Sequence, residues 1–498
     1  MELIRTDLQY YEPTHTLHSM FTESTDAIVP DAEPDIGHIL CAYASVTVKD
    51  ELPQSDRILL SGNASVTVLY RPDGQDAIRL LQIPLSFAHI EETPGILPDS
   101  PCFLRCQVGS VAARAVNSRK VNVAVTFVLE IDVFAESGLT LTEEIDPQGE
   151  ALELLYGQQT VSLLCYAAAR EFTALDDLEL PGAQGLRLIC ARGALRPAAC
   201  QPSPDQLTLS GEALLWLLLM DDTGALVTMT QAIPYTQVLD APGLRGSLPT
   251  CARLALRSLD CMLREDGVLS VGLGVRALVT QQAEQTIQVI RDLYHLHREL
   301  HCDTREVMLC TYAADAPFQL ESAVQMPVGR AAAEILSADG TCLSAEAHGG
   351  ALEAQIQVCL LYRDPTGAVC AESQPLTVPL AATGLPEGAA PQDLSVQLSA
   401  APGGEGSVSL RVTATGNLVI QAQIPIRDIT ALCADAPRQP ADQPGTTLVL
   451  RYIHTPTPLW EIAKQYASTA QAIRQANALP EGTETAADTM LLIPVYAQ

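Results

Sequence analysis

Three histidines and a cysteine lie close together in the middle of the chain, and side chains of these types can bind a metal. They are His295, His297, His301 and Cys302. On a helix, His297 and His301 would stand four residues apart on one face, where two imidazoles can chelate zinc. The metalloprotease pattern needs a glutamate directly after its first histidine, and that position holds Arg298. We therefore predict a polar connector here and no metal site.

The remaining sequence has no spacing that is typical of an active site. It contains no Gly-x-Ser-x-Gly, no Walker loop and no Gly-x-Gly-x-x-Gly, which are patterns that position a nucleophile or a phosphate. Carboxylate pairs such as Glu143-Glu144 and Asp221-Asp222 are typical of solvated turns and strand ends. We predict that the protein is not an enzyme and has no catalytic residue and no cofactor.

The charge balance excludes some partners. The chain has 498 residues, with 29 Lys and Arg against 59 Asp and Glu, so its formal net charge is −30. Binding to nucleic acid or to an anionic membrane surface needs a basic surface, so neither partner is expected. The longest apolar run, Ala213–Met220, is far shorter than the roughly 20 residues of a membrane-spanning helix. We expect no direct membrane insertion.

The cysteines and the first residues indicate a compartment. The 14 cysteines form no Cys-x-x-Cys pair, and most lie in apolar, strand-like runs. The first residues lack the apolar core that is typical of a signal peptide. We therefore predict reduced core thiols and a cytoplasmic location. A disulfide framework is the alternative that the sequence leaves open.

One pattern occurs three times along the chain. A glycine begins a strand-like run, a polar turn follows, and a second run ends in an aliphatic–proline pair. The turn glycines are Gly74, Gly224 and Gly367. Each turn predicts a β-hairpin, because Asp and Gly supply the local bonding and positive φ that tight turns need. Each copy closes with an alternating run, which predicts a half-buried antiparallel strand. In the first copy this run is Val121, Val123, Val125, Phe127, Leu129, Ile131 and Val133.

These patterns predict a mainly β chain with three repeated β-sandwich-like domains, helical connectors and a small α+β (βααβ) domain at the C-terminus. The connectors 149–170 and 284–301 are predicted to be helical. In the last domain we expect a strand at 448–452, helices at 459–466 and 469–477, and a strand at 490–494. The predicted domains are 1–136, 149–283, 284–433 and 446–498, with a Pro-rich linker at 434–445.

The C-terminal domain resembles a LysM domain. The matching blocks are Leu459–Tyr466, Ile473, Asn477-Ala478-Leu479 and Leu491–Pro494. LysM domains usually bind N-acetylglucosamine glycans through the loop before the first helix and the loop before the last strand. In the first loop, Pro456-Thr457-Pro458 replaces the usual Gly-Asp-Thr. Because proline removes an N–H donor and fixes φ, this loop argues against glycan binding.

The three repeats resemble SPOCS domains. The resemblance rests on the Ser-Gly strand start, the Asp-Gly type turn, the Ile-Pro run and, in copy one, Asn117-Ser118-Arg119-Lys120. Three such repeats followed by a LysM domain resemble the clostridial spore coat morphogenesis proteins. This resemblance implies a scaffold in the mother-cell cytoplasm at the forespore surface. It also implies that the LysM domain binds the coat-basement ATPase, stage IV sporulation protein A, and that the repeats contact other coat proteins. The alternative is a peptidoglycan-binding protein that uses its LysM domain.

Five residues are the candidate partner-binding face of the LysM domain. Trp460 and Lys464 would share one face of the first helix, because they are four residues apart. Tryptophan is also enriched at interface hot spots. The predicted face consists of Trp460, Ile462, Lys464, Tyr466 and Asn477. The alternative, that these side chains only hold the small domain together, stays open.

Overall fold

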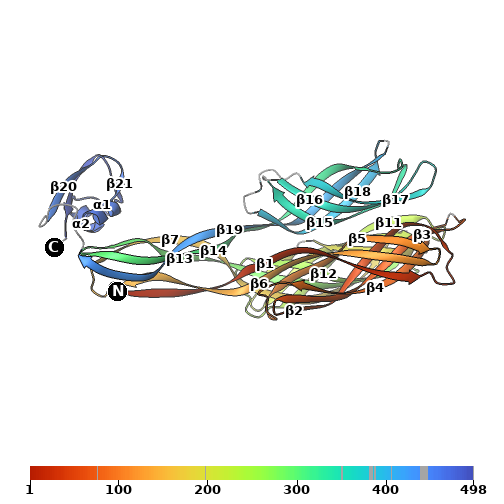
Figure 1. Ribbon diagram of the computed structural model, residues 1–498, viewed down its shortest axis with the longest axis horizontal. Helices are drawn as coiled ribbons and strands as arrows, with labels where there is room; N and C mark the ends of the chain where they lie inside the picture. The colour runs from red at the N-terminus through yellow and green to blue at the C-terminus, as the bar shows by residue number, and fades with distance from the viewer. Residues whose placement is uncertain are drawn as a thin grey trace.

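The computed structural model describes the chain apart from residues 76, 197, 349–350, 381–384, 386–388, 405, 438–446 and 497–498 and the side chains of 313–316 and 348. The molecule is elongated. Three β-rich units lie at one end, a narrow stalk of long strands follows, and a small module lies at the other end (Figure 1). The prediction of a mainly β chain is confirmed.

Three long antiparallel ribbons run from the units into the stalk. Each strand has 27 to 31 residues, which corresponds to about 90 to 100 Å at roughly 3.3 Å per residue. The ribbons are β1 (Glu2–Ile28) with β6 (Lys120–Asp146), β7 (Leu152–Glu179) with β13 (Val268–His295), and β14 (Arg298–Pro327) with β19 (Ser407–Pro437). In the stalk the ribbons bury aliphatic side chains against one another, including Leu141, Leu163 and Ile426.

Each unit adds a three-stranded sheet and one further strand to its ribbon. The sheets are β2 (Ile36–Gln54), β3 (Arg57–Pro72) and β4 (Arg79–Glu92); β8 (Arg187–Leu195), β10 (Gln206–Met220) and β11 (Leu226–Asp240), with β9 (Ala199–Ser203) beside β10; and β15 (Glu334–His348), β16 (Ala351–Arg363) and β17 (Val369–Leu380). The further strands β5 (Cys102–Asn117), β12 (Thr250–Leu263) and β18 (Ala389–Pro402) pair with β6, β13 and β19. Each sheet shares an apolar core with the strands of its own ribbon, so each unit is a two-layer sandwich.

The three predicted hairpins are confirmed as β3–β4, β10–β11 and β16–β17. Their turn glycines Gly74, Gly224 and Gly367 all have positive φ. The carboxylate of Asp221 accepts hydrogen bonds from two backbone N–H groups of its turn, and Asp364 does the same in the third unit. All seven alternating residues of the first copy are buried on one face of β6.

The repeat glycine makes room for an aromatic ring in the first two units, where it lies inside its strand and not at the strand start. Gly62 pairs with Phe87 across β3–β4, and a Cβ on Gly62 would lie 2.6 Å from the Phe87 ring. Gly211 pairs with Tyr235 across β10–β11, where a Cβ would lie 2.6 Å from the tyrosine oxygen. The corresponding Gly349-Gly350 lies outside the described residues.

The prediction that the connectors are helical is wrong. Residues 152–170 belong to β7, and 284–295 belong to β13. In β13 the buried residues Ile287, Ile290 and Tyr294 are three and four positions apart, which is a helical spacing. These three residues belong to three different buried clusters, so this part of β13 buries both of its sides. The register shift between Ile290 and Asp292 interrupts the period of two as well. The same strand crosses the predicted domain boundary at 283–284.

The C-terminal module has the predicted order of elements. It consists of β20 (Leu448–Ile453), β21 (Thr457–Pro458), α1 (Leu459–Gln465), α2 (Ala470–Ala476), β22 (Thr485–Ala486) and β23 (Thr489–Pro494). β20 pairs with β23 in antiparallel fashion, and both helices contribute to one core with this sheet. Of the predicted linker, 434–437 is the end of β19, and the remainder lies outside the described residues.

Candidate functional site

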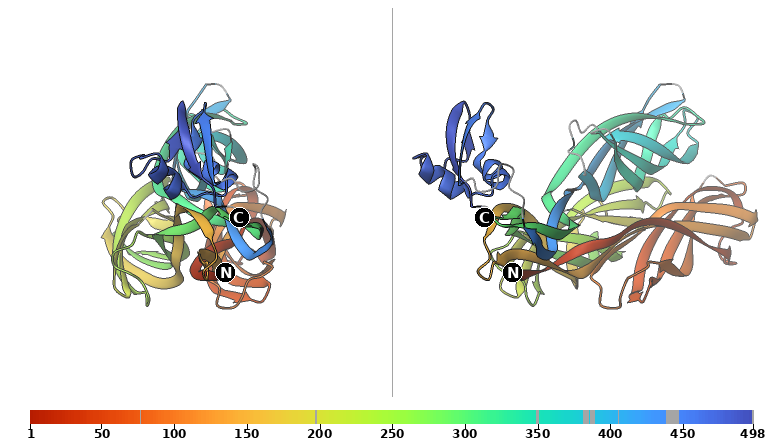
Figure 2. Two further views of the ribbon diagram at one scale, coloured as in Figure 1. Left: turned by 90° about the vertical axis from the view of Figure 1, so that its left-hand side faces the viewer. Right: turned by 60° about the vertical axis from the view of Figure 1, so that its left-hand side comes forward.

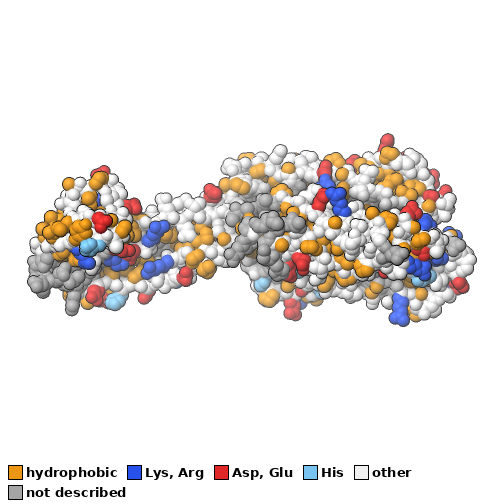
Figure 3. Space-filling view, turned by 90° about the horizontal axis from the view of Figure 1, so that it is seen from above, with side chains coloured by type: hydrophobic (Ala, Val, Ile, Leu, Met, Phe, Trp, Pro, Cys, Tyr) orange, Lys and Arg blue, Asp and Glu red, His pale blue; other side chains and the backbone are white. Residues whose placement is uncertain are grey.

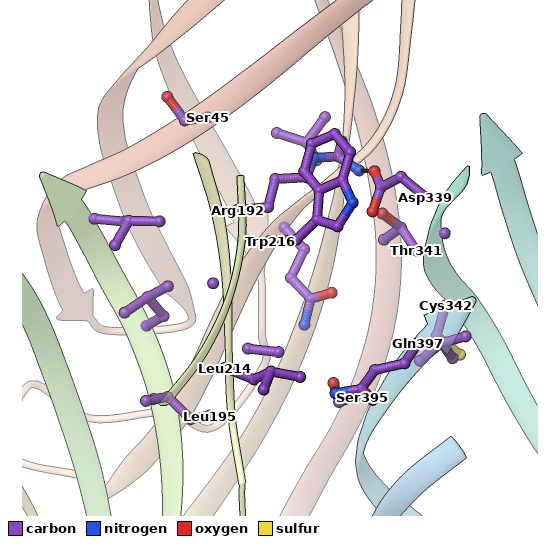
Figure 4. Close-up of a pocket in the computed structure, with 18 of the residues that line it drawn as sticks. Ser45, Arg192, Leu195, Leu214, Trp216, Asp339, Thr341, Cys342, Ser395 and Gln397 are labelled. Carbon is purple, nitrogen blue, oxygen red and sulfur yellow. Dashed lines mark ion pairs between the residues drawn. The ribbon is translucent and has the colours of Figure 1, made fainter. Parts of the chain in front are cut away.

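A cavity of about 280 Å³ lies where the three units meet (Figure 4). The three units form lobes around the long axis of the molecule (Figure 2, left). The cavity is lined by β2 and β5 of the first unit, β8, β10, β11 and β12 of the second, and β15 and β18 of the third. Trp216 and Arg192 of the second unit face Asp339 and Thr341 of the third.

The charged side chains that line this cavity are paired with groups of the protein. Arg192 forms an ion pair with Asp339, and Arg105 forms one with Glu130. Asp393 lies 3.1 Å from the guanidinium of Arg253. The pairs Arg192–Asp339 and Arg253–Asp393 join different units, whereas Arg105–Glu130 lies within the first unit.

Arg253 connects all three units. It lies on β12, its Nη2 is 2.8 Å from Glu130 of the first unit, and it also pairs with Asp132. The third unit supplies Asp393, and the guanidinium lies 3.9 Å from the centre of the Phe103 ring. Burial alone would lower the pKa of Arg253, but the three carboxylates raise it above its ordinary value. The guanidinium of Arg253 therefore stays protonated at the junction of the three units.

The histidine cluster forms the turn between β13 and β14. His295 is buried, its Nε2 lies 3.0 Å from Glu150, and its Nδ1 accepts hydrogen bonds from the backbone N–H groups of His297 and Arg298. His301 and Cys302 lie on β14, so the helix that would align His297 with His301 does not form. Within the described ranges, no three His, Cys, Asp or Glu side chains are grouped to hold a metal.

Trp460 and Lys464 share one face of α1, and this face lies against the end of the stalk. Trp460 Nε1 donates a hydrogen bond to Asp292 Oδ2 at 2.8 Å. Lys464 Nζ lies 2.6 Å from Asp292 Oδ1 and 2.7 Å from Oδ2. The rings of Trp460 and Tyr294 meet edge to face at 4.8 Å, and the Tyr294 hydroxyl donates to the carbonyl of Ser468 at 2.7 Å. We call Trp460, Lys464 and the carbonyl of Ser468, which follows the helix, the α1 face.

The other three residues of the predicted face are structural parts of the module. Ile462 and Tyr466 are buried in its core. Asn477 joins α2 to β23: its Nδ2 donates to the carbonyls of Ile473 and Leu492, and its Oδ1 accepts from Leu492 N, all at 2.7 Å. The five residues therefore do not form one exposed surface, which differs from the expectation.

The module instead exposes an apolar surface on the other side of its sheet. Leu448, Leu450 and Tyr452 of β20 are 53%, 63% and 43% exposed, and Met490 of β23 is 53% exposed. The helices cover the opposite side, where Leu491 and Ile493 are buried. These four exposed side chains are called the outer face. Hydrophobic side chains gather over this end of the molecule when it is seen from above (Figure 3).

No protein-family model, curated protein or solved structure matches this chain. Among the described residues, no helix is long and apolar enough to cross a membrane. Both helices of the described chain, α1 and α2, belong to the C-terminal module.

The sequence carries a signal for the outer face that the LysM-like motif does not include. β20 consists of Leu-Val-Leu-Arg-Tyr-Ile and carries apolar residues on both sides, although the two helices can cover only one side of a two-stranded sheet. A strand of this kind in so small a module predicts an exposed apolar surface.

The loop before α1 and the loop before β23 are joined to each other in this module. Thr457-Pro458 pairs with Thr485-Ala486, and Leu459 N donates to the carbonyl of Glu484 at 2.8 Å. Pro456 and Pro458 offer no N–H group in the first loop. The loops are therefore bonded to one another, with two fewer donors for a sugar.

Proposed function

We propose that this chain is a non-enzymatic scaffold of spore coat assembly that resembles SipL, the clostridial spore coat morphogenesis protein. In this proposal the three units are SPOCS-type repeats and the C-terminal module is a LysM domain. The module docks onto the coat-basement ATPase, stage IV sporulation protein A, at the forespore surface in the mother-cell cytoplasm. The units contact other coat proteins.

The outer face is the observation that carries this proposal. Exposed apolar patches on soluble proteins mark interaction sites, and Tyr and Met are enriched in protein interfaces. The outer face combines Leu448, Leu450, Tyr452 and Met490 on one small sheet. The module lies at the end of the stalk, away from the three units (Figure 1). A large protein partner can therefore approach it without meeting the units.

The remainder of the chain supports a scaffold role. Arg253 and its three carboxylates join the units through charges on three separate segments of the chain. The stalk strands continue directly from the units, so the units and the module are held at opposite ends of one body. A body of this kind can hold two partners at a set distance.

The test is a pull-down with the full-length chain and two baits, the coat ATPase of the same organism and insoluble peptidoglycan. We expect capture by the ATPase and its loss in a Leu450→Ser, Tyr452→Ser double variant. The matched control is Leu175→Ser on β7, which removes a leucine that is 80% exposed outside the module. Circular dichroism confirms that each variant is folded.

Two results would contradict the proposal. Capture by peptidoglycan alone would favour the glycan-binding alternative. Capture by the ATPase that the double variant leaves unchanged would show that the outer face is not the docking surface.

A further inference from the structure

The end of the stalk contacts the α1 face through an acidic and an aromatic side chain. One carboxylate, Asp292, receives Lys464 Nζ on both oxygens and the indole N–H of Trp460 on one of them. Two residues further along the same strand, Tyr294 places its ring against Trp460 and its hydroxyl on the carbonyl of Ser468. The α1 face thus binds an acidic group and an aromatic group together.

The geometry of β13 places Asp292 and Tyr294 side by side. Residues two apart on a strand point to the same side, so Asp292 and Tyr294 stand next to each other. The register shift between Ile290 and Asp292 leaves Arg291 as the extra residue on β13, and a bulge re-aims the side chains that follow it. An extended segment of the form acidic–x–aromatic is therefore the shape that the α1 face fits.

The contact between the stalk and the α1 face is weak enough for another segment to replace the stalk. Asp292 and Lys464 are both partly open to solvent, with side chains 33% and 42% exposed, and ion pairs of this kind contribute little. Beyond this pair, Tyr294 and Leu296 are the buried stalk residues that join the core of the module. A competing segment has to replace the ion pair with Lys464, the hydrogen bond from Trp460 and the contacts of Tyr294.

We propose that the α1 face is a second binding surface of the module, specific for an extended acidic–x–aromatic segment of a protein partner. The residues Asp292-Leu293-Tyr294 of the stalk occupy it in the free chain. A partner that presents such a segment displaces the stalk from the α1 face. This inference concerns a surface other than the outer face and does not depend on the identity of the coat partner.

The experiment uses Trp460 fluorescence. The chain has two tryptophans, so Trp216→Phe makes Trp460 the only reporter. Trp216 lies at the junction of the units, where its replacement could disturb the packing. The fluorescence of Trp460 is therefore also obtained as the difference between the native chain and Trp460→Phe. Acrylamide quenching is compared between the parent chain and Asp292→Asn, with Glu299→Gln as the control for loss of an exposed carboxylate near the turn.

We expect Asp292→Asn to raise the quenching of Trp460, and Glu299→Gln to leave it unchanged. A synthetic peptide of residues 288–296 should restore protection in the Asp292→Asn chain, whereas the same peptide with asparagine in place of the aspartate should not. Quenching that is the same in Asp292→Asn and the parent would overturn the contact itself. Equal effects of the two peptides, or no effect of either, would overturn the specificity. No coat protein is present, so these outcomes are separate from those of the pull-down.

Discussion

Asp292 on the stalk and Lys464 on α1 are 172 residues apart in the chain, and their carboxylate oxygen and ammonium nitrogen lie 2.6 Å apart. This pair joins the module to the end of the stalk through charge as well as through packing. The ionisation of one carboxylate therefore contributes to the position of the module.

Acidification should loosen the module from the stalk. Burial would raise the pKa of Asp292, but hydrogen bonds from Lys464 and Trp460 outweigh it and place the pKa below the ordinary value of 3.8. A depressed pKa means that the docked state is favoured above 3.8 and loses this contribution as the pH falls through the lowered value. Quenching of Trp460 by acrylamide should therefore rise at low pH. Asp292→Asn is the control and should show high quenching without this step, whereas an identical step in both chains would contradict the assignment to Asp292.

Loss of Arg253 should destabilise the junction of the three units. Arg253→Met leaves Glu130, Asp132 and Asp393 without their shared cation in a buried site. Breaking one side of a buried ionic network costs about 3–5 kcal/mol. Thermal unfolding followed by circular dichroism should show a lower midpoint. The matched control is Arg411→Met, whose partner Glu321 is exposed, and its midpoint should stay at that of the parent. Equal midpoints for the two variants would contradict the role of Arg253.

A side chain at Gly62 should disturb the first unit. In Gly62→Ala the added methyl group would meet the ring of Phe87 and the carbonyl of Thr47, which is part of the neighbouring strand β2. Overpacking of this kind costs about 1–3 kcal/mol. Hydrogen exchange measured by mass spectrometry should show faster exchange over β3 and β4. Gly404→Ala is the control, because an added Cβ there meets no neighbouring atom. Unchanged exchange in β3 and β4 would show that the close packing on Gly62 is not needed.

Local chemistry explains which parts of the fold were predictable. The hairpin turns depend on Asp and Gly residues within a few positions of each other, and the alternating strand of β6 keeps its period of two. The stalk strands escaped prediction because the bulge at Ile290 and burial between ribbons give β13 an apparent helical spacing. The packing of the units depends on pairs such as Arg253 and Glu130, 123 residues apart, which no local pattern indicates.

In the candidate site, too, local patterns were predictable and contacts between distant parts of the chain were not. The shared face of Trp460 and Lys464 followed from their spacing on one helix, but the partner of that face, Asp292, lies 168 residues from Trp460. Ile462 lies in the helix next to these residues and points to the core, so membership of a motif did not indicate exposure. The outer face was not predicted, although the apolar residues on both sides of β20 are a local signal for it.

The cysteines should differ widely in their rate of alkylation. Thiolate is the reactive form, and burial raises the pKa of Cys106 to about 12. At pH 8 only about one Cys106 thiol in ten thousand would then be ionised, and its sulfur lies inside the core of the first unit. Cys433 is exposed near the end of β19, and its hydrogen bond to Asp435 also raises the pKa of its thiol. Access should therefore decide the order of reaction. We expect iodoacetamide to label Cys433 first in the native chain, and Cys106 only after unfolding in guanidinium, as followed by peptide mass spectrometry. Labelling of Cys106 at the rate of Cys433 under native conditions would show that the sandwich of the first unit is open in solution.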